Sequence, residues 1–145
     1  MKILNFASLL SLQNPALAAS FQSAEILSVS PLQDPHLPGE LIKCEIGAQS
    51  FVLALICASF CDEPYFADLD LEYLSGESSV GEEEIEQIAE FLEECENIVI
   101  DSSFLAHADA KNIFEFLQML GRNVVLADGE QAEFKTDGKL TPLKE

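Results

Sequence analysis

The chain is poor in positive charge. No Lys or Arg lies between Lys43 and Lys111, and 7 basic residues face 26 Asp and Glu, giving a formal net charge of −19 at pH 7. Nucleic acids and anionic lipid headgroups attract proteins through cations, so neither is an expected partner. An excess of carboxylates instead favours a basic protein surface as the partner. The alternative is that the acidic surface only keeps the protein in solution.

The chain also lacks a long apolar run and a CxxC cysteine pair. No run approaches the roughly 18 apolar residues of a transmembrane helix, so we expect no transmembrane span. The run Ile3 to Leu12, followed by Ala16-Leu17-Ala18, has features of a secretory signal, but a single lysine precedes it and Gln13-Asn14-Pro15 interrupts it. We therefore expect no signal peptide, and reduced thiols in a cytoplasmic protein.

What is present indicates a folded core. Apolar residues make up 48% of the 145-residue chain, ten residues are Phe, and the mean hydropathy is +0.17. This content is too apolar for a disordered acidic protein, and the length suits one core. We expect a small single α/β domain, with a parallel βαβ unit in the second half and a mixed sheet packed by a buried helix. Residues 1–38 are expected to form an N-terminal extension with a strand and a proline-rich connection, residues 39–129 the α/β core, and residues 130–145 a polar, frayed tail.

The first half of the chain contains two strand patterns and one apolar run. Residues 24–30 and 40–46 have the composition and alternation of strands, with a proline-rich connection between them. The uncharged run 51–61 exceeds a usual strand and is rich in Ala and Leu. It predicts a helix buried on all sides with Ser50 as its N-cap, and a buried strand is the competing interpretation. Residues 1–23 alternate weakly and fit a strand or a short helix.

The second half alternates between helix and strand patterns. A capping box at Ser79 to Glu82, followed by apolar residues at helical spacing, predicts a helix over 82–96. A buried strand at 97–101, a helix capped by Asp109, and a strand at 123–127 follow. This spacing predicts a parallel pair joined by a right-handed crossover. The outer face of the first helix is assigned to a protein partner, through Glu82, Glu83, Glu86, Glu90 and Glu93.

The loop after the 97–101 strand is a candidate for ligand binding. Ligands of open α/β sheets bind beyond the carboxyl ends of the strands. The loop contains Asp101, Ser102, Ser103 and His107, which include the residue types of a hydrolase triad. No Gly-x-Ser-x-Gly turn surrounds either serine, so we expect no hydrolysis. The alternative role of these residues is to end the strand and to cap the next helix.

The cysteines and the acidic residues are weak candidates for a metal site. The thiols are Cys44, Cys57, Cys61 and Cys95, and Cys57 and Cys61 share one face of the predicted helix. Cluster ligands usually lie in loops, whereas this pair lies in an apolar run, so we interpret all four as small core residues. Asp68, Asp70 and Glu72 alternate as on an extended segment but do not match an EF-hand. We therefore expect no cofactor.

Residues 66–128 resemble a segment of the large subunit of the bacterial NADH-quinone oxidoreductase, respiratory complex I. The resemblance is carried by residues 68–85, DLDLEYLSGESSVGEEEI, and by residues 110–120, AKNIFEFLQML, followed by the Val124-Val125 strand. Residues 39–60 belong to the same match as a strand leading into an apolar helix. In that family the corresponding region is a molybdopterin-oxidoreductase-like domain with a largely structural role. This chain lacks the family's cysteine-rich cluster-binding segments and is far shorter, and residues 1–38 are not covered.

The resemblance implies a non-catalytic accessory or docking subunit of a respiratory electron-input module, peripheral on the cytoplasmic side of the inner membrane. Its acidic surface would then contact a basic subunit. A second hypothesis is a degenerate domain that binds a small ligand at the loop 101–107. A third is an iron–sulfur electron carrier that uses the cysteines.

Overall fold

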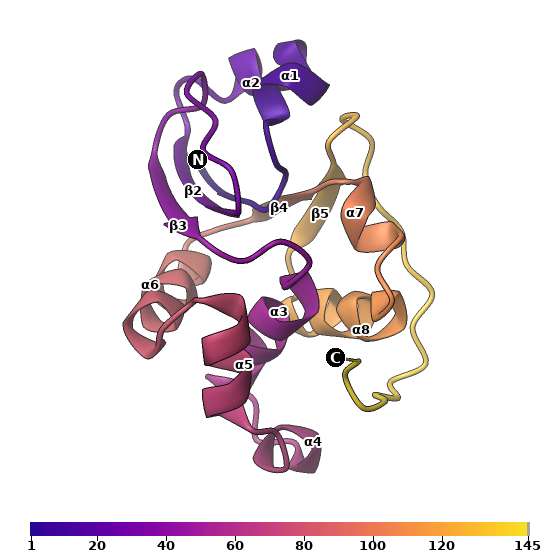
Figure 1. The fold of residues 1–145 in the computed structure, drawn as a ribbon. Coiled ribbons are helices and arrows are strands. Elements are labelled where there is room, and N and C mark those ends of the chain that lie inside the picture. The colour runs from indigo at the N-terminus through magenta and orange to yellow at the C-terminus, as the bar shows by residue number, and fades with distance from the viewer. Residues whose placement is uncertain (145) are drawn as a thin grey trace.

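The computed structural model describes residues 1–144, and its centre is a five-stranded parallel sheet (Figure 1). The spatial order is β3-β2-β1-β4-β5, and each neighbouring pair is parallel. The strands are β1 (Lys2–Asn5), β2 (Glu25–Ser30), β3 (Glu40–Lys43), β4 (Asn97–Ile100) and β5 (Asn123–Leu126). The α/β class and the βαβ unit are confirmed, but the sheet is parallel throughout and not mixed.

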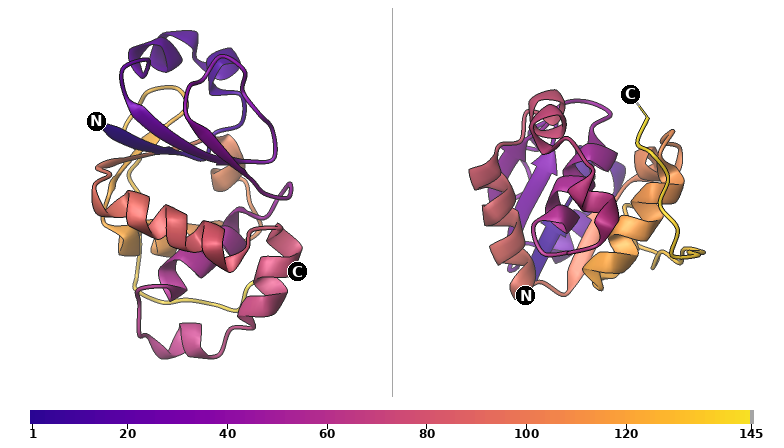
Figure 2. Two further views of the ribbon diagram at one scale, coloured as in Figure 1. Left: turned by 90° about the vertical axis from the view of Figure 1, so that its left-hand side faces the viewer. Right: turned by 90° about the horizontal axis from the view of Figure 1, so that it is seen from below.

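Helices cover both faces of the sheet. In chain order they are α1 (Leu10–Gln13), α2 (Pro15–Ser20), α3 (Gln49–Ala58), α4 (Pro64–Ala67), α5 (Leu71–Ser78), α6 (Glu82–Glu93), α7 (Ser102–Leu105) and α8 (Ala110–Leu120). Helices α1 and α2 lie on one side, and α3, α6 and α8 lie on the other (Figures 1 and 2). No helix within residues 1–144 has both the length and the apolar character needed to cross a bilayer.

The first strand occupies the centre of the sheet. Residues 1–38 were expected to be an extension, yet β1 pairs with β2 on one side and with β4 on the other. Ile3 and Leu4 are fully buried and face opposite sides of the sheet, in two separate apolar clusters. The weak alternation arises because a central parallel strand is apolar on both faces. The N-terminal segment is therefore part of the core.

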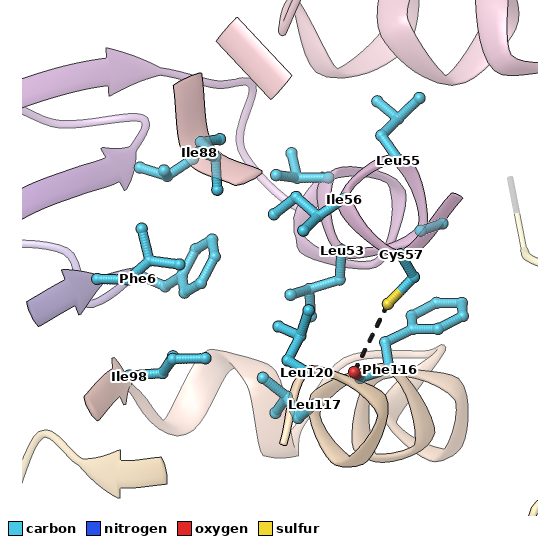
Figure 3. Packing of buried hydrophobic residues seen from close by; sticks show 14 of the residues in the cluster. Phe6, Leu53, Leu55, Ile56, Cys57, Ile88, Ile98, Phe116, Leu117 and Leu120 are labelled. Carbon is cyan, nitrogen blue, oxygen red and sulfur yellow. Dashed lines mark hydrogen bonds between the residues drawn. The ribbon is translucent and has the colours of Figure 1, made fainter. Parts of the chain in front are cut away.

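The main core lies between the sheet and the helix layer. The predicted helix at 51–61 is confirmed as α3, which packs against α5, α6 and α8. Figure 3 shows Leu53 and Ile56 of α3 in one apolar cluster with Ile98 of the sheet and Leu117 of α8. Neighbours on every side explain why its sequence carries no charge.

The start of α3 differs from the prediction. Ala48 holds the N-cap position, and Ser50 lies inside the helix, where its hydroxyl donates to Asp109 Oδ2 at 2.9 Å. Asp109 holds the N-cap position of α8, as predicted, but makes no capping bond with its side chain there. The Ser50–Asp109 hydrogen bond thus joins α3 to α8, and neither side chain caps its own helix.

A helix that the sequence did not reveal lies between α4 and α6. The alternation of Asp68 with Asp70 suggested an extended segment, but Asp70 is the N-cap of α5 and its carboxylate accepts a hydrogen bond from Tyr73 N at 3.1 Å. Ser79 adopts a left-handed conformation at the end of α5 and therefore cannot begin α6. Gly81 is the N-cap of α6 instead, and its N–H donates to Glu84 Oε1 at 3.0 Å, which is one half of a capping box, since glycine has no side chain to supply the other half.

The C-terminal segment is bound along α8, although we expected it to be frayed (Figure 2). Three buried polar residues on α8, spaced three apart, receive its backbone: Asp109, Asn112 and Glu115. The Glu115 carboxylate accepts the N–H groups of residues 137 and 138, at 3.2 and 3.1 Å. Asn112 binds both backbone groups of Thr141, with Oδ1 accepting from N at 3.0 Å and Nδ2 donating to O at 2.8 Å. Polar side chains on an apolar helix face are stable here because each has a partner.

Replacing Asn112 tests this attachment. We expect Asn112→Ala to lower the free energy of unfolding by about 1–3 kcal/mol, because a buried polar pair is lost, and to expose residues 130–144 to protease. Urea denaturation and limited proteolysis measure the two effects. The control is Asn123→Ala, whose side-chain bonds are exposed, and which should cost less than about 0.5 kcal/mol. Equal effects of the two substitutions would contradict the role given to Asn112.

Candidate functional site

The strand order creates a reversal point between β1 and β4. The chain runs outward from β1 to β3, then crosses back to β4 and continues outward to β5. Open α/β sheets bind ligands in the crevice that such a reversal opens at the carboxyl ends of the strands. In this protein the crevice lies between residues 6–9, which follow β1, and Asp101, which follows β4. The sequence-predicted candidates Asp101, Ser102 and Ser103 thus lie at the expected place in the fold.

The crevice is closed by the protein's own groups. Asp101 Oδ2 accepts a hydrogen bond from Ser8 N at 3.0 Å, which joins the two loops directly. Behind this bond the rings of Phe6 and Phe104 pack with centroids 5.6 Å apart. A cavity of about 30 Å³ lies beside the ends of β1 and β2, near Asn5. This volume suits about one water molecule and not a nucleotide.

Asp101 and Ser103 form a local cap and not a catalytic pair. Asp101 is buried and its Oδ1 accepts the backbone N–H of Ser103 at 3.1 Å, which caps α7. The Ser103 hydroxyl donates to the same oxygen and accepts from Gln49 Nε2 at 3.0 Å. Ser102 is exposed on the first turn of α7. These contacts match the alternative role given to this loop, which is to end the strand and to cap the next helix.

His107 is bound to a different loop. Its Nδ1 accepts the backbone N–H of Asp109 at 2.9 Å, so the proton lies on Nε2, which donates to Gly47 O at 2.7 Å. Both ring nitrogens therefore have backbone partners, and among residues 1–144 neither bonds to Ser103 or Asp101. Asp101, Ser103 and His107 therefore do not form a catalytic triad.

Three of the four thiols are buried in the core. Cys57 donates to Phe116 O at 3.6 Å, and Cys95 donates to Asn97 O at 3.1 Å (Figure 3 shows the first bond). Burial raises the pKa of Cys44 to about 11 and also raises the pKa values of Cys57 and Cys95. Within the described residues no three His, Cys, Asp or Glu side chains are grouped so as to hold a metal ion. Cys61 is partly exposed.

The acidic face of α6 is open to solvent, as the sequence pattern predicted. We use this name for Glu82, Glu83, Glu86, Glu90 and Glu93, all of which are exposed, while Ile85, Ile88 and Leu92 of the same helix are buried. No salt bridge within residues 1–144 involves any of these five glutamates. The nearby cation Arg122 donates to the main-chain oxygens of Leu92 and Leu120. Within residues 1–144 these five glutamates thus have no ion-pair partner.

Two grooves flank the acidic face. One, the α5–α6 groove, has a volume of about 740 Å³ and lies between α3, α5 and α6. Its apolar lining is formed by Leu55, Ala58, Leu71, Val80 and Ile85. The second, of about 530 Å³, lies between α6 and α8 and shares Ser59 and Glu86 with the first. The helix layer therefore presents apolar hollows on both sides of a row of carboxylates.

The sequence did not reveal the α5–α6 groove, because Asp68, Asp70 and Glu72 were interpreted as part of an extended segment and α5 was not predicted. The available signal was Asp70 placed three residues before Tyr73, which fits an N-cap and the first turn of a helix. Comparisons with protein-family models, with curated proteins and with solved structures give no match to this chain. The resemblance of residues 66–128 to the large respiratory subunit therefore stays a prediction.

Removing the Asp101 carboxylate tests its structural role. We expect Asp101→Ala to lower the free energy of unfolding by about 1–3 kcal/mol, since the N–H groups of Ser8 and Ser103 lose their acceptor. Urea denaturation measures the effect. Asp128→Ala is the control, because Asp128 makes a similar turn bond to Glu130 N at an exposed position. An unchanged stability for Asp101→Ala would show that the crevice is not held closed by this residue.

Alkylation by iodoacetamide tests the placement of the thiols. The thiolate is the reactive form, and a pKa near 11 leaves about one Cys44 thiol in a thousand ionised at pH 8. We expect rapid labelling of Cys61 alone in the native protein, and labelling of all four thiols in urea. Because burial raises the thiol pKa, the slow labelling of Cys44 should accelerate as the pH rises towards 11. Mass spectrometry of the peptides measures each rate, and similar rates at all four sites would contradict the buried assignment.

Proposed function

We propose that this chain is a non-catalytic docking subunit of a respiratory NADH-quinone oxidoreductase-type electron-input module. It attaches to a basic surface of a larger subunit, peripheral on the cytoplasmic side of the inner membrane. The observation that carries the proposal is the acidic face of α6, five exposed glutamates without a salt bridge within residues 1–144. The resemblance of residues 66–128 supplies the identity of the complex.

The electrostatics of the whole chain support docking to a cationic partner. Its net charge of −19 attracts a basic surface and accelerates the encounter at low salt. The described salt bridges lie elsewhere, with Lys2 contacting Glu25 and Glu94 and with Lys111 contacting Asp137. The glutamates along α6 have no ion-pair partner within residues 1–144. Lys or Arg side chains of another chain could therefore pair with them.

The second hypothesis, a domain that binds a small ligand, has one observation in its favour. The strand order forms a reversal point at β1 and β4, where such ligands bind in other α/β sheets. The Ser8–Asp101 bond at this point, and the small volume of the cavity at the ends of β1 and β2, weigh against that hypothesis. The docking function therefore has the stronger support.

Co-purification tests the proposed function. The tagged full chain is expressed in its native host, extracted in mild detergent at low salt, and analysed by mass spectrometry. We expect subunits of a respiratory complex to accompany it and to be lost as the salt concentration rises, because exposed charge pairs are screened. Recovery of the chain alone at low salt would refute the docking function.

Neutralising part of the acidic face shows whether α6 supplies the contact. We expect a Glu83→Gln, Glu90→Gln, Glu93→Gln variant to bind the recovered subunits roughly 3- to 100-fold more weakly, as expected for three exposed ion pairs. Affinity is measured by titration of the purified partner. The control replaces Asp128, Glu130 and Glu133 by their amides, which removes the same charge from exposed positions after β5. Equal weakening by both variants would assign the attraction to net charge and not to α6.

A further inference from the structure

The α5–α6 groove combines an apolar lining with an acidic rim. Leu55, Val80 and Ile85 are buried in its floor, whereas Leu71 at its edge is 42% exposed. Glu72, Glu82 and Glu86 line the same groove from α5 and α6. A volume of about 740 Å³ lies within the range of roughly 300–1,000 Å³ that is typical of binding pockets. The groove thus offers apolar contact below and negative charge above.

Gly76 forms part of the wall of this groove. It lies within α5 and lines the groove, and a Cβ atom built at this position meets no atom within 4 Å. Its backbone also lacks the positive φ angle that favours glycine. Glycine destabilises a helix relative to alanine, so neither packing nor conformation of the isolated domain accounts for it. Glycine does allow another backbone to approach α5 closely.

The charges around the groove select the kind of occupant. A second copy of this chain would bring its own carboxylates against Glu72, Glu82 and Glu86, and like charges across an interface are strongly unfavourable. A cationic occupant would instead be attracted by the rim and by the acidic face beside it. An amphipathic helix fits a hollow between helices, because its apolar side enters the groove and its charged side meets the rim.

We propose that the α5–α6 groove binds a basic amphipathic helix of the partner subunit. The inference rests on the docking function proposed above and assigns to it the contact site and the chemistry of the contacted segment. The helix places apolar side chains against Leu71 and the floor, and places Lys or Arg side chains beside the rim glutamates. Close approach occurs at Gly76.

Two groove variants and one matched control test the contact. Gly76→Leu fills the groove from an open position, and Leu71→Ser removes an apolar group from its edge. Leu105→Ser is the control, because Leu105 on α7 is also 42% exposed and lies outside both grooves. We expect both groove variants to bind the recovered respiratory subunit roughly tenfold or more weakly, as for loss of an apolar anchor, and the control to bind as the unmodified chain does. Circular dichroism and urea midpoints establish that all three fold.

Photo-crosslinking identifies the occupant. A benzophenone amino acid replaces Glu77, which is exposed beside Gly76 on α5 and does not line the groove, in the full chain in its native host, and the crosslinked peptide is sequenced by mass spectrometry. The expected peptide has apolar residues at helical spacing and Lys or Arg on the opposite side. Crosslinking to an acidic segment, or to a second copy of this chain, would overturn the inference.

The two proposals fail in different ways. A salt-sensitive complex that survives both Gly76→Leu and Leu71→Ser overturns the groove and leaves the docking function standing. Recovery of no respiratory subunit by the unmodified chain overturns the docking function, and the partner helix with it. If the two groove variants no longer bind the respiratory subunit and Leu105→Ser still binds it, both the docking function and the groove contact are supported.

Discussion

The pairing of β1 with β2 and β4 is the constraint on which the rest of the structure depends. A strand of four residues joins two halves of the sheet that would otherwise share no edge. Ile3 and Leu4 have no exposed surface, and burial of each such side chain stabilises the fold by about 1.5–3 kcal/mol. Without β1 the strands β2 and β3 would separate from β4 and β5. The carboxyl edge, the helix layer and the surface proposed for docking are all positioned relative to β1.

Hydrogen bonds at the carboxyl edge explain why the fold carries no open crevice there. Asp101 holds the loop after β1, Ser103 contacts Gln49 at the start of α3, and His107 contacts Gly47. Three of the four candidate residues, Asp101, Ser103 and His107, thus bond to other parts of the same edge. The polar residues of the reversal point thus fix the positions of loops. A fold that elsewhere holds ligands is here filled with its own contacts.

Five exposed carboxylates without an ion-pair partner within residues 1–144 lie along α6. The helix layer on this side of the sheet includes α5 and α6 (Figure 2). Two apolar grooves flank the exposed carboxylates of α6. The core residues of α6 face α3, so its glutamates must face outward. The same amphipathic pattern that attaches the helix to the core therefore supplies the surface proposed for docking. Packing and the proposed docking function thus use different residues of one helix.

The sequence by itself determined the elements whose signals are local. The amphipathic period of α6, the apolar run of α3, the strands β4 and β5, and the left-handed Gly121 that ends α8 follow from spacing and composition. The excess of carboxylates on α6 was equally visible, because exposed charge depends on helical period alone. These properties arise within about ten neighbouring residues.

Only the tertiary structure decided the properties that depend on distant partners. The central place of β1, the Ser50–Asp109 bond and the attachment of Thr141 to Asn112 each join residues far apart in the chain. Candidate residues such as Ser103 and His107 lay within five positions of each other in the sequence, yet their hydrogen bonds lead to different loops. Side-chain hydrogen bonds form with whichever group the fold brings within about 3 Å, and sequence spacing does not specify that group.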